Sequence, residues 1–213
     1  YRDQRQFRTM NSTVTDIDGN QYYTLQLCSN EWLTENLKTT RYRNGESISL
    51  VEDSSAWSQL VTGAMCYYNN DLNANKLTYG ALYNWHVVDD ERGLCPEGWH
   101  VPEDSVWINL RSNYLVINEN VGGVLKEVGT VHWMEPNESA SNESSFTALP
   151  AGWRFDDHGE YENLGRLACF WTSTEYAGNT AFFPSLSHES RDIRLDEYGS
   201  KTRGRSVRCI RDK

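Results

Sequence analysis

Long hydrophobic runs and basic residues are what this sequence has least of. No stretch approaches the ~20 apolar residues that a membrane-spanning helix needs, and the mean hydropathy is −0.69. The 20 Lys and Arg stand against 30 Asp and Glu, for a formal net charge of −10. Nucleic acids and anionic membrane surfaces bind concentrated positive charge, so this balance argues against both as partners. We therefore expect no transmembrane segment and no nucleic-acid partner.

The motifs of common enzymes are also missing. The sequence contains no Gly-x-Ser-x-Gly, no zinc-binding His-Glu-x-x-His, no Walker loop and no dinucleotide-binding glycine motif. The acidic pairs Asp89-Asp90 and Asp156-Asp157 stand in turn sequences, where adjacent carboxylates usually form a solvated face rather than a glycosidase site. We expect a protein without catalytic residues and without enzymatic activity.

Cysteine is present, but not in the patterns that bind metals. No CxxC pair occurs and no histidine lies at zinc-ligand spacing, so no metal site is predicted. Disulfide bonds are the favoured use, and an odd count leaves at least one cysteine over within the chain. The cysteines are Cys28, Cys66, Cys95, Cys169 and Cys209.

One acidic run invites a calcium hypothesis. Residues 16–20 read Asp-Ile-Asp-Gly-Asn, but an EF-hand loop has its glycine at the sixth position and a Glu at the twelfth, and neither is found here. The run predicts a turn. We expect no cofactor, and the motif does not support calcium.

The pattern along the chain predicts an α+β fold. Residues 1–12 are polar and indicate an N-terminal arm or linker, and residues 13–213 are long enough for one domain. A β-hairpin is predicted over 13–27, one helix from Asp104 or Ser105 to Tyr114, and a second helix over 79–88. Several short antiparallel strands separated by long loops follow, at 169–174, 181–187, 191–195 and 206–210.

Residues 94–102 read Leu-Cys-Pro-Glu-Gly-Trp-His-Val-Pro, which resembles the central signature of the Fibrobacter succinogenes major paralogous domain. This module is common in surface and secreted proteins of Fibrobacter and Bacteroidetes. The resemblance implies an extracellular or outer-membrane location, with a lipid anchor on a removed leader left open. Further segments resemble the family in the same order, at residues 13–20, 32–40, 79–85, 142–154, 171–175 and 206–212.

A second, more distant resemblance concerns the fold. Residues 100–107 and 142–154, with the closing Val-Arg-Cys209, are similar to pieces of the formylglycine-generating enzyme group, whose fold is a decorated C-type-lectin-like domain. The resemblance implies that architecture here, but the copper-binding cysteine pair of those oxidases is not matched. The lectin tripeptide Glu-Pro-Asn occurs at 135–137 without the Trp-Asn-Asp partner, since residues 171–173 read Trp-Thr-Ser. We interpret that tripeptide as a chance match.

The family motifs also lead to two disulfide predictions. Cys95 and Cys209 lie in motifs at opposite ends of one expected core, so we predict that they are bonded. Cys28 and Cys169 both stand where the family usually carries other residues, and we predict a second bridge between them, which leaves Cys66 as the odd thiol.

The functional hypotheses concern binding. The eight Trp and twelve Tyr suit a loop-rich exported domain, and the first hypothesis is a protein-binding or assembly module whose partners are other cell-surface or outer-membrane proteins. The alternative is a carbohydrate-binding, lectin-like module that uses loops at 69–75, 133–145 and 176–190, and a formylglycine-generating-type oxidase is the least favoured. The expected contact residues, each with a core role left open, are Trp57, Trp133, Phe182 and Phe183.

Overall fold

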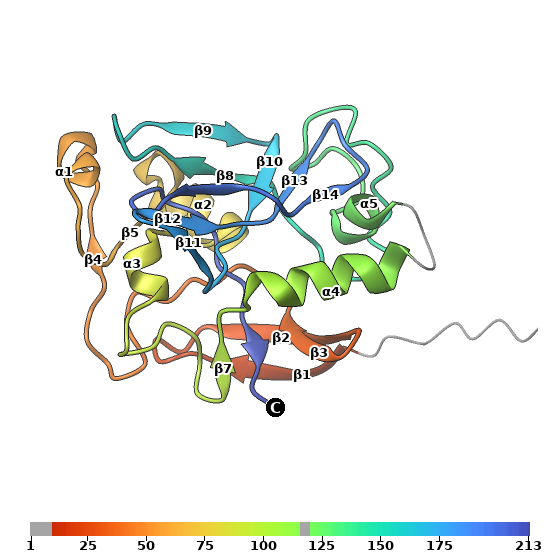
Figure 1. Cartoon of the computed structure of the whole chain (residues 1–213), viewed down its shortest axis with the longest axis horizontal. Helices are drawn as coiled ribbons and strands as arrows, with labels where there is room; N and C mark the ends of the chain where they lie inside the picture. Colours follow the sequence, from red (N-terminus) through yellow and green to blue (C-terminus); the bar gives the residue numbers. More distant parts are fainter. Residues whose placement is uncertain (1–9, 116–119) are drawn as a thin grey trace, which may run out of the picture.

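The chain folds as a mixed α+β protein that is mostly β. The computed structural model describes residues 10–115 and 120–213 (Figure 1). Residues 1–9, most of the arm expected at 1–12, lie outside them, and the first strand begins at Met10. Within the described ranges, no helix is both long and apolar enough to cross a bilayer.

The largest sheet joins the two ends of the described chain, in the strand order β1-β2-β3-β16-β7. β1 and β2 form the hairpin predicted over 13–27. Ile210 of β16 pairs with Trp32 on one side and His100 on the other, so β16 is an inner strand of this sheet. The strand bounds are β1 Met10–Thr15, β2 Gln21–Leu27, β3 Asn30–Leu33, β7 Trp99–His100 and β16 Ile210–Arg211.

A disulfide bond joins Cys95 to Cys209, as predicted. The two Cα atoms are 6.1 Å apart across a sequence separation of 114 residues, and both side chains lie in the first hydrophobic core. In the chain-entropy account, a cross-link that closes a loop of roughly 100 residues stabilises the fold by about 4.7 kcal/mol. The bond therefore holds the turn before β7 to the residue before β16.

The second predicted bridge is wrong. Cys28 is exposed at the turn between β2 and β3, in a left-handed conformation with φ 54°. Cys169 ends a strand of another sheet, has no exposed surface, and is not bonded to Cys28. Cys28 lies beside the five-stranded sheet and Cys169 in a three-stranded sheet. The fact that the family usually carries other residues at both positions therefore did not indicate a contact between them. Cys66 is buried in β5 and remains a thiol.

Within the described residues, four smaller sheets accompany the largest one. The late part of the chain is rich in short strands, as expected, and β11, β12 and β15 form one three-stranded antiparallel sheet. The bounds are β4 Ser49–Leu50, β5 Ala64–Cys66, β6 Leu82–Tyr83, β8 Ala151–Arg154, β9 Tyr161–Leu164, β10 Leu167–Cys169, β11 Glu175–Ala177, β12 Thr180–Phe182, β13 Ser185–Ser187, β14 Ile193–Arg194 and β15 Tyr198–Ser200.

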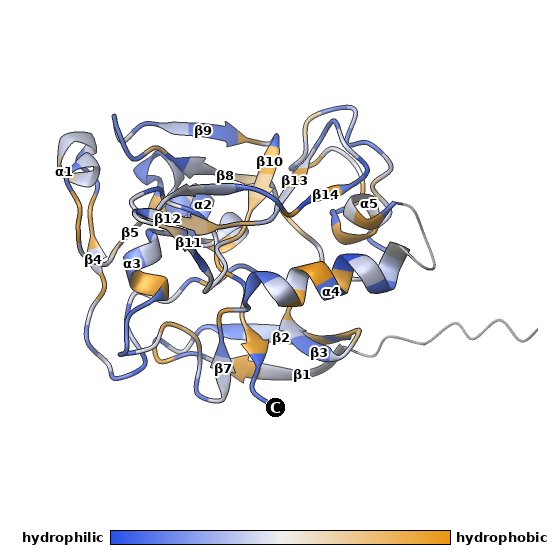
Figure 2. Ribbon diagram, viewed as in Figure 1, coloured by the Kyte–Doolittle hydropathy of each residue, from blue (hydrophilic) through white to orange (hydrophobic). Residues whose placement is uncertain are grey.

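The central helix α4 follows the sequence prediction closely. Trp107, Leu110 and Tyr114 recur on one side and are buried in the second hydrophobic core, and Figure 2 shows the alternation of apolar and polar residues along this helix. Asp104 begins the helix, and its backbone N–H donates to the hydroxyl of Thr174. The helices are α1 Ser54–Ser58, α2 Leu72–Tyr79, α3 Trp85–Val88, α4 Asp104–Leu115 and α5 Val121–Leu125, with a 3-10 turn at Tyr68–Asn70.

The helix predicted over 79–88 is broken in two places. Gly80 has φ 77°, and a Cβ there would lie 2.8 Å from the carbonyl oxygen of Leu37. Tyr83 then pairs its backbone with Arg205 from the end of the chain. A long-range strand contact therefore replaces the local helical preference, and within 80–88 only α3 is helical.

The polar loop predicted at 69–75 is partly helical. The side chain of Asp71 accepts hydrogen bonds from the backbone N–H groups of Asn73 and Ala74, which is the usual capping arrangement at a helix start. Because this segment is rich in asparagine, its sequence did not indicate that α2 begins within it.

Candidate functional site

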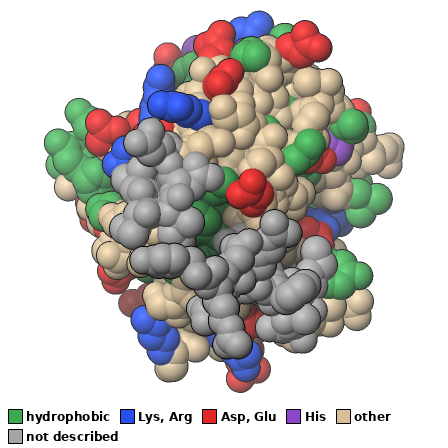
Figure 3. All heavy atoms as spheres, turned by 90° about the vertical axis from the view of Figure 1, so that its right-hand side faces the viewer, with side chains coloured by type: hydrophobic (Ala, Val, Ile, Leu, Met, Phe, Trp, Pro, Cys, Tyr) green, Lys and Arg blue, Asp and Glu red, His purple; other side chains and the backbone are tan. Residues whose placement is uncertain are grey.

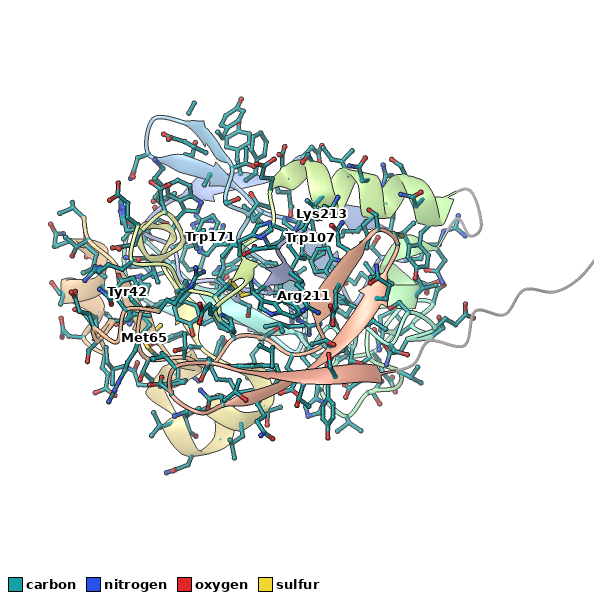
Figure 4. All side chains as sticks on the ribbon, turned by 90° about the horizontal axis from the view of Figure 1, so that it is seen from below. Tyr42, Met65, Trp107, Trp171, Arg211 and Lys213 are labelled. Carbon is teal, nitrogen blue, oxygen red and sulfur yellow. A yellow bond between two sulfur atoms is a disulfide. The ribbon has the colours of Figure 1, made fainter. Side chains whose placement is uncertain are left out.

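Three of the four expected contact residues are core residues. Trp57 is 0% exposed, Trp133 1% and Phe183 7%, so the expectation that they contact a partner is corrected. Phe182, the last residue of β12, is half-buried. Figure 4 shows two further aromatic residues, Trp107 and Trp171, directed into the body of the molecule in the same way.

Trp57 is buried beneath a cation. The guanidinium of Arg154 lies 4.5 Å from the centre of the Trp57 ring and has no exposed surface. Arg154 donates hydrogen bonds to the backbone carbonyls of Val51, Glu52 and Gly159. The arginine thus satisfies loop carbonyls that no strand pairs, and the indole closes the space beside it.

Trp133 is buried in the same manner. The ammonium of Lys126 lies 5.5 Å from its ring and donates to the carbonyl oxygens of Glu138, Ser187 and Ser190, each at 2.9 Å. Burial lowers the pKa of Lys126 to about 8, which leaves the side chain charged at neutral pH. This cation holds the loop at Glu138 to the end of β13 and the turn that follows it.

A third buried cation repeats the pattern. Arg208 donates to the side-chain oxygen of Asn36 and to the carbonyls of Phe146 and Thr147, and its guanidinium lies 4.2 Å from the Phe146 ring. We call Lys126, Arg154 and Arg208 the carbonyl-bound cations. Each fixes loops by charge-assisted hydrogen bonds while an aromatic ring covers it.

Phe183 covers a fourth buried cation. The guanidinium of Arg205 lies between the rings of Phe183, at 3.7 Å, and Trp171, at 4.2 Å. Both rings are buried, so Phe183 belongs to the inner face of the β11–β12–β15 sheet.

The outer side of that sheet carries an exposed aromatic cluster, made of Tyr176, Phe182 and Tyr198, which we call the aromatic platform. The Tyr176 and Tyr198 rings stack at 4.1 Å, and Tyr176 meets Phe182 edge-on at 5.0 Å. Tyr176 is 48% exposed and Tyr198 52%. In Figure 4 the pale blue hairpin of β11 and β12 at the upper left carries side chains that project away from the body.

Strand register explains how the platform forms. Phe182 pairs with Tyr198 across β12 and β15, so the two side chains share one face. The neighbouring pair, Ala181 and Gly199, points to the other face, where Ala181 is fully buried. Side chains alternate between faces along a strand, and here the alternation separates an apolar interior from an aromatic surface.

Charged residues of both signs border the platform. Lys201 forms an ion pair with Glu175 at 2.8 Å, and Arg194 lies 3.7 Å from Glu197. An aromatic centre with a polar rim is the arrangement found where proteins bind other proteins. On another face, shown in Figure 3, acidic and basic side chains are intermixed around scattered apolar residues.

A small hollow lies beside the disulfide. Its volume is about 200 Å³, with Asp16, Arg43, Cys95 and Glu97 among its lining residues, which is below the usual size of a ligand pocket. The carboxylate of Asp16 already accepts from Tyr22 and from backbone N–H groups. The hollow therefore offers less binding chemistry than the platform.

The lectin-like tripeptide is used internally. Asn137 is 5% exposed, and its side-chain amide donates to the carbonyls of Glu127 and Gly129. Among the described residues, no group of three or more His, Cys, Asp or Glu side chains is placed to hold a metal ion.

Sequence reasoning missed the two tyrosines of the platform. Tyr176 and Tyr198 each follow a glutamate and precede a small residue, which is a polar setting that indicates exposure. The pairings of β12 with β11 and with β15 bring them beside Phe182, and those pairings could not be predicted from the sequence.

The comparison with family models gave a match over most of the chain. The model described as Fibrobacter succinogenes major domain matches residues 26–211. A search of curated proteins and a search of solved structures each found no match.

Proposed function

The chain belongs to the Fibrobacter succinogenes major domain family, and from this premise we propose that it is a non-catalytic module that binds another protein of a bacterial cell surface. The observation that carries the proposal is the aromatic platform. Exposed tyrosines in a cluster are the side chains that most often supply binding energy in protein interfaces. Most other large aromatic side chains of the chain lie in the core.

A protein partner suits the platform better than a sugar does. Tyr176 has one ring face against Tyr198 and meets Phe182 edge-on, so its faces are largely used within the cluster. A sugar would need an open ring face beside clustered acceptors, whereas a protein can lay apolar side chains across the whole cluster.

Export and a C-type-lectin-like architecture are part of the proposal. The disulfide between Cys95 and Cys209 supports an oxidising compartment outside the cytoplasm. The pairing of the last strand with β3 and β7, with α4 and long loops between, supports the lectin-like arrangement.

Site-specific photo-crosslinking tests the proposal. A photoreactive phenylalanine analogue replaces Tyr198 in one variant and Tyr23 in a control variant, and both are irradiated with intact envelopes of the source organism. Tyr23 is the matched control because it is 54% exposed, against 52% for Tyr198. It lies on β2 of the five-stranded sheet.

We expect a discrete protein adduct from the probe at position 198 and none from the probe at position 23. Equal adducts from both positions would show non-specific contact. A glycan array that binds the wild type and not a Tyr176→Ser/Tyr198→Ser variant would favour the carbohydrate alternative instead.

A further inference from the structure

The sheet that carries the platform has an open edge at β11. Within the described residues β11 pairs with β12 alone, and all of Glu175–Ala177 is exposed. β15, at the opposite edge, is less open, because Gly199 and Ser200 are half-buried and the Ser200 carbonyl already accepts from the N–H of Arg203. An exposed edge strand presents backbone donors and acceptors with which another strand can pair.

The ladder between β11 and β12 determines which backbone groups of β11 face outward. Glu175 is the register partner of Ala181, and the carbonyl of Thr174 accepts from the N–H of Phe182. This pattern makes Glu175 and Ala181 a non-hydrogen-bonded pair, so the N–H and the carbonyl of Glu175 point away from β12. Among the described residues, no hydrogen bond outside the ladder reaches either group. The edge therefore offers a donor and an acceptor to a pairing strand.

The platform lies directly beside this edge. Tyr176 follows Glu175 on β11, and its exposed ring contacts Phe182 and Tyr198. Opposite side chains of paired strands share a face, so a strand added to β11 would place every second side chain next to Tyr176. The register of β11 shifts between Glu175 and Ala177, so the added strand would be short. Backbone pairing would position it, while the platform supplies apolar contact.

Acidic side chains stand at one end of the edge. Thr174, the residue before β11, donates to the carboxylate of Asp104, and in Figure 4 the hairpin of β11 and β12 lies beside the start of α4. Glu103 is exposed and accepts from the hydroxyl of Ser105. Within the described part of the chain, both carboxylates thus bind hydroxyl groups rather than cations. A basic side chain is the complement of this end of the edge.

From the open edge, the platform and this charge, we propose that β11 is the docking site for an extended segment of the partner protein. The inference rests on the proposed function and specifies the chemistry of the partner. The segment pairs with Glu175 as an added strand, with apolar side chains at every second position over the platform and a lysine or arginine beside Glu103. A second copy of this chain fits less well, because two chains of net charge −10 repel each other.

Synthetic peptides test the inference on the full chain. The probe is the acetylated and amidated peptide Lys-Val-Thr-Val-Thr-Val-Lys, and its counterpart carries Glu in place of both Lys. Titration of the isotope-labelled protein is followed by NMR. We expect the lysine peptide to bind saturably, with the largest shifts at residues 174–177 and in the platform, and the glutamate peptide to bind roughly two- to fivefold more weakly. No saturable binding of the lysine peptide, or equal affinities of the two peptides, would overturn the inference.

The backbone contact is tested with Glu175→Pro and the control Glu175→Ala. Both variants remove the glutamate side chain, but only proline removes the outward N–H, which the ladder with β12 does not use. We expect the lysine peptide to bind Glu175→Pro roughly three- to tenfold more weakly than Glu175→Ala, the effect of one hydrogen bond. Equal affinities of two folded variants would contradict strand pairing.

The charge is tested separately, which keeps the inference falsifiable if proline disrupts the sheet. Glu103→Lys should weaken binding of the lysine peptide by roughly two- to fivefold. The control Glu162→Lys changes an exposed position on β9 of another sheet and should bind like wild type. Equal effects of the two substitutions would show that the peptide responds only to the overall charge, and the proposed site would be wrong.

Crosslinking from position 198 separates this inference from the proposed function. The photoreactive probe is placed in the Glu175→Ala and Glu175→Pro backgrounds and irradiated with intact envelopes. Loss of the adduct in the proline background alone supports pairing at the edge. Equal adducts in both would show that a protein binds the platform without the edge, so the inference fails while the proposed function stands. No adduct even in the wild-type background would contradict the proposed function, and the inference with it.

Discussion

Trp133 and Tyr198 show how differently this chain treats two aromatic side chains in polar loop sequences. Trp133 is 1% exposed beneath Lys126, whereas Tyr198 is 52% exposed and stacks on another tyrosine. Beside Trp133 a buried ammonium binds three loop carbonyls. Beside Tyr198 the strands pair with each other, and the aromatic rings are left outside.

The difference teaches where a loop-rich fold places its aromatic residues. Irregular backbone leaves carbonyl groups without strand or helix partners, and burying them unpaired costs free energy. A cation that binds several carbonyls removes that cost, and a ring that covers the cation is buried with it. Tyr176 and Tyr198 stack on each other instead and stay exposed.

The largest effect is expected from removing Arg208. Arg208→Met leaves the acceptors on Asn36, Phe146 and Thr147 without their donor, and each buried unpaired acceptor costs about 1–3 kcal/mol. We expect the free energy of unfolding to fall by about 3 kcal/mol or more, measured by urea denaturation. The control Arg211→Met removes a 61% exposed side chain and should cost less than about 1 kcal/mol; equal losses would contradict the role of the buried cation.

The next largest effect is expected at alkaline pH, which should lower the free energy of unfolding. Burial raises the pKa of Cys66 to about 11 and that of Cys169 to about 12, from 9.0. The folded state holds these protons more tightly than the unfolded chain, so stability is complete below pH 9 and is lost as the pH rises toward 11 and 12. We expect a loss on the order of 2 kcal/mol per thiol, measured as urea midpoints from pH 7 to 11. A Cys66→Ala/Cys169→Ala variant with the same slope would show that the thiols do not cause it.

Lys126→Met should have a smaller effect than Arg208→Met. It removes the donor of three carbonyls that are only partly enclosed, so water can replace part of what is lost. We expect about 1–2 kcal/mol, together with raised hydrogen exchange in residues 138–140 and 187–190. Lys126→Arg keeps the charge and should recover part of the loss. An unchanged urea midpoint in Lys126→Met would show that the buried ammonium beside Trp133 does not stabilise the fold, which would contradict the contrast drawn between Trp133 and Tyr198.

The platform should contribute least to stability. Tyr176→Ser/Tyr198→Ser removes two exposed rings that contact mainly each other and Phe182, so we expect the free energy of unfolding to change by less than about 1 kcal/mol. Circular dichroism and urea denaturation check this. A loss as large as that of Arg208→Met would show that the platform is part of the core.

Part of the fold could be predicted from the sequence because the residues that determine it are close together in the chain. The helix α4 follows from its capping residues and apolar spacing, and the hairpin of β1 and β2 from its turn. The disulfide between Cys95 and Cys209 followed from the family resemblance. These three features depend on short stretches or on motifs that the sequence displays directly.

The rest depends on contacts between distant residues. Trp57 is buried because Arg154, far along the chain, brings a guanidinium to its ring. The segment 79–88 breaks because Tyr83 pairs with Arg205. The platform exists because β12 pairs with both β11 and β15. Amphipathic patterns record whether a residue is apolar, but not which distant cation or strand it meets.

The affinity of the platform variants for the crosslinked partner tests the central claim most directly. Wild type, Tyr176→Ser/Tyr198→Ser and the control Tyr23→Ser are compared by calorimetry against the partner captured at position 198. Loss of a hot-spot pair worth about 2–4 kcal/mol predicts that Kd rises by roughly 30-fold or more in the double variant, while Tyr23→Ser binds like wild type. Equal affinities for all three proteins would contradict the proposal that the aromatic platform is the binding surface.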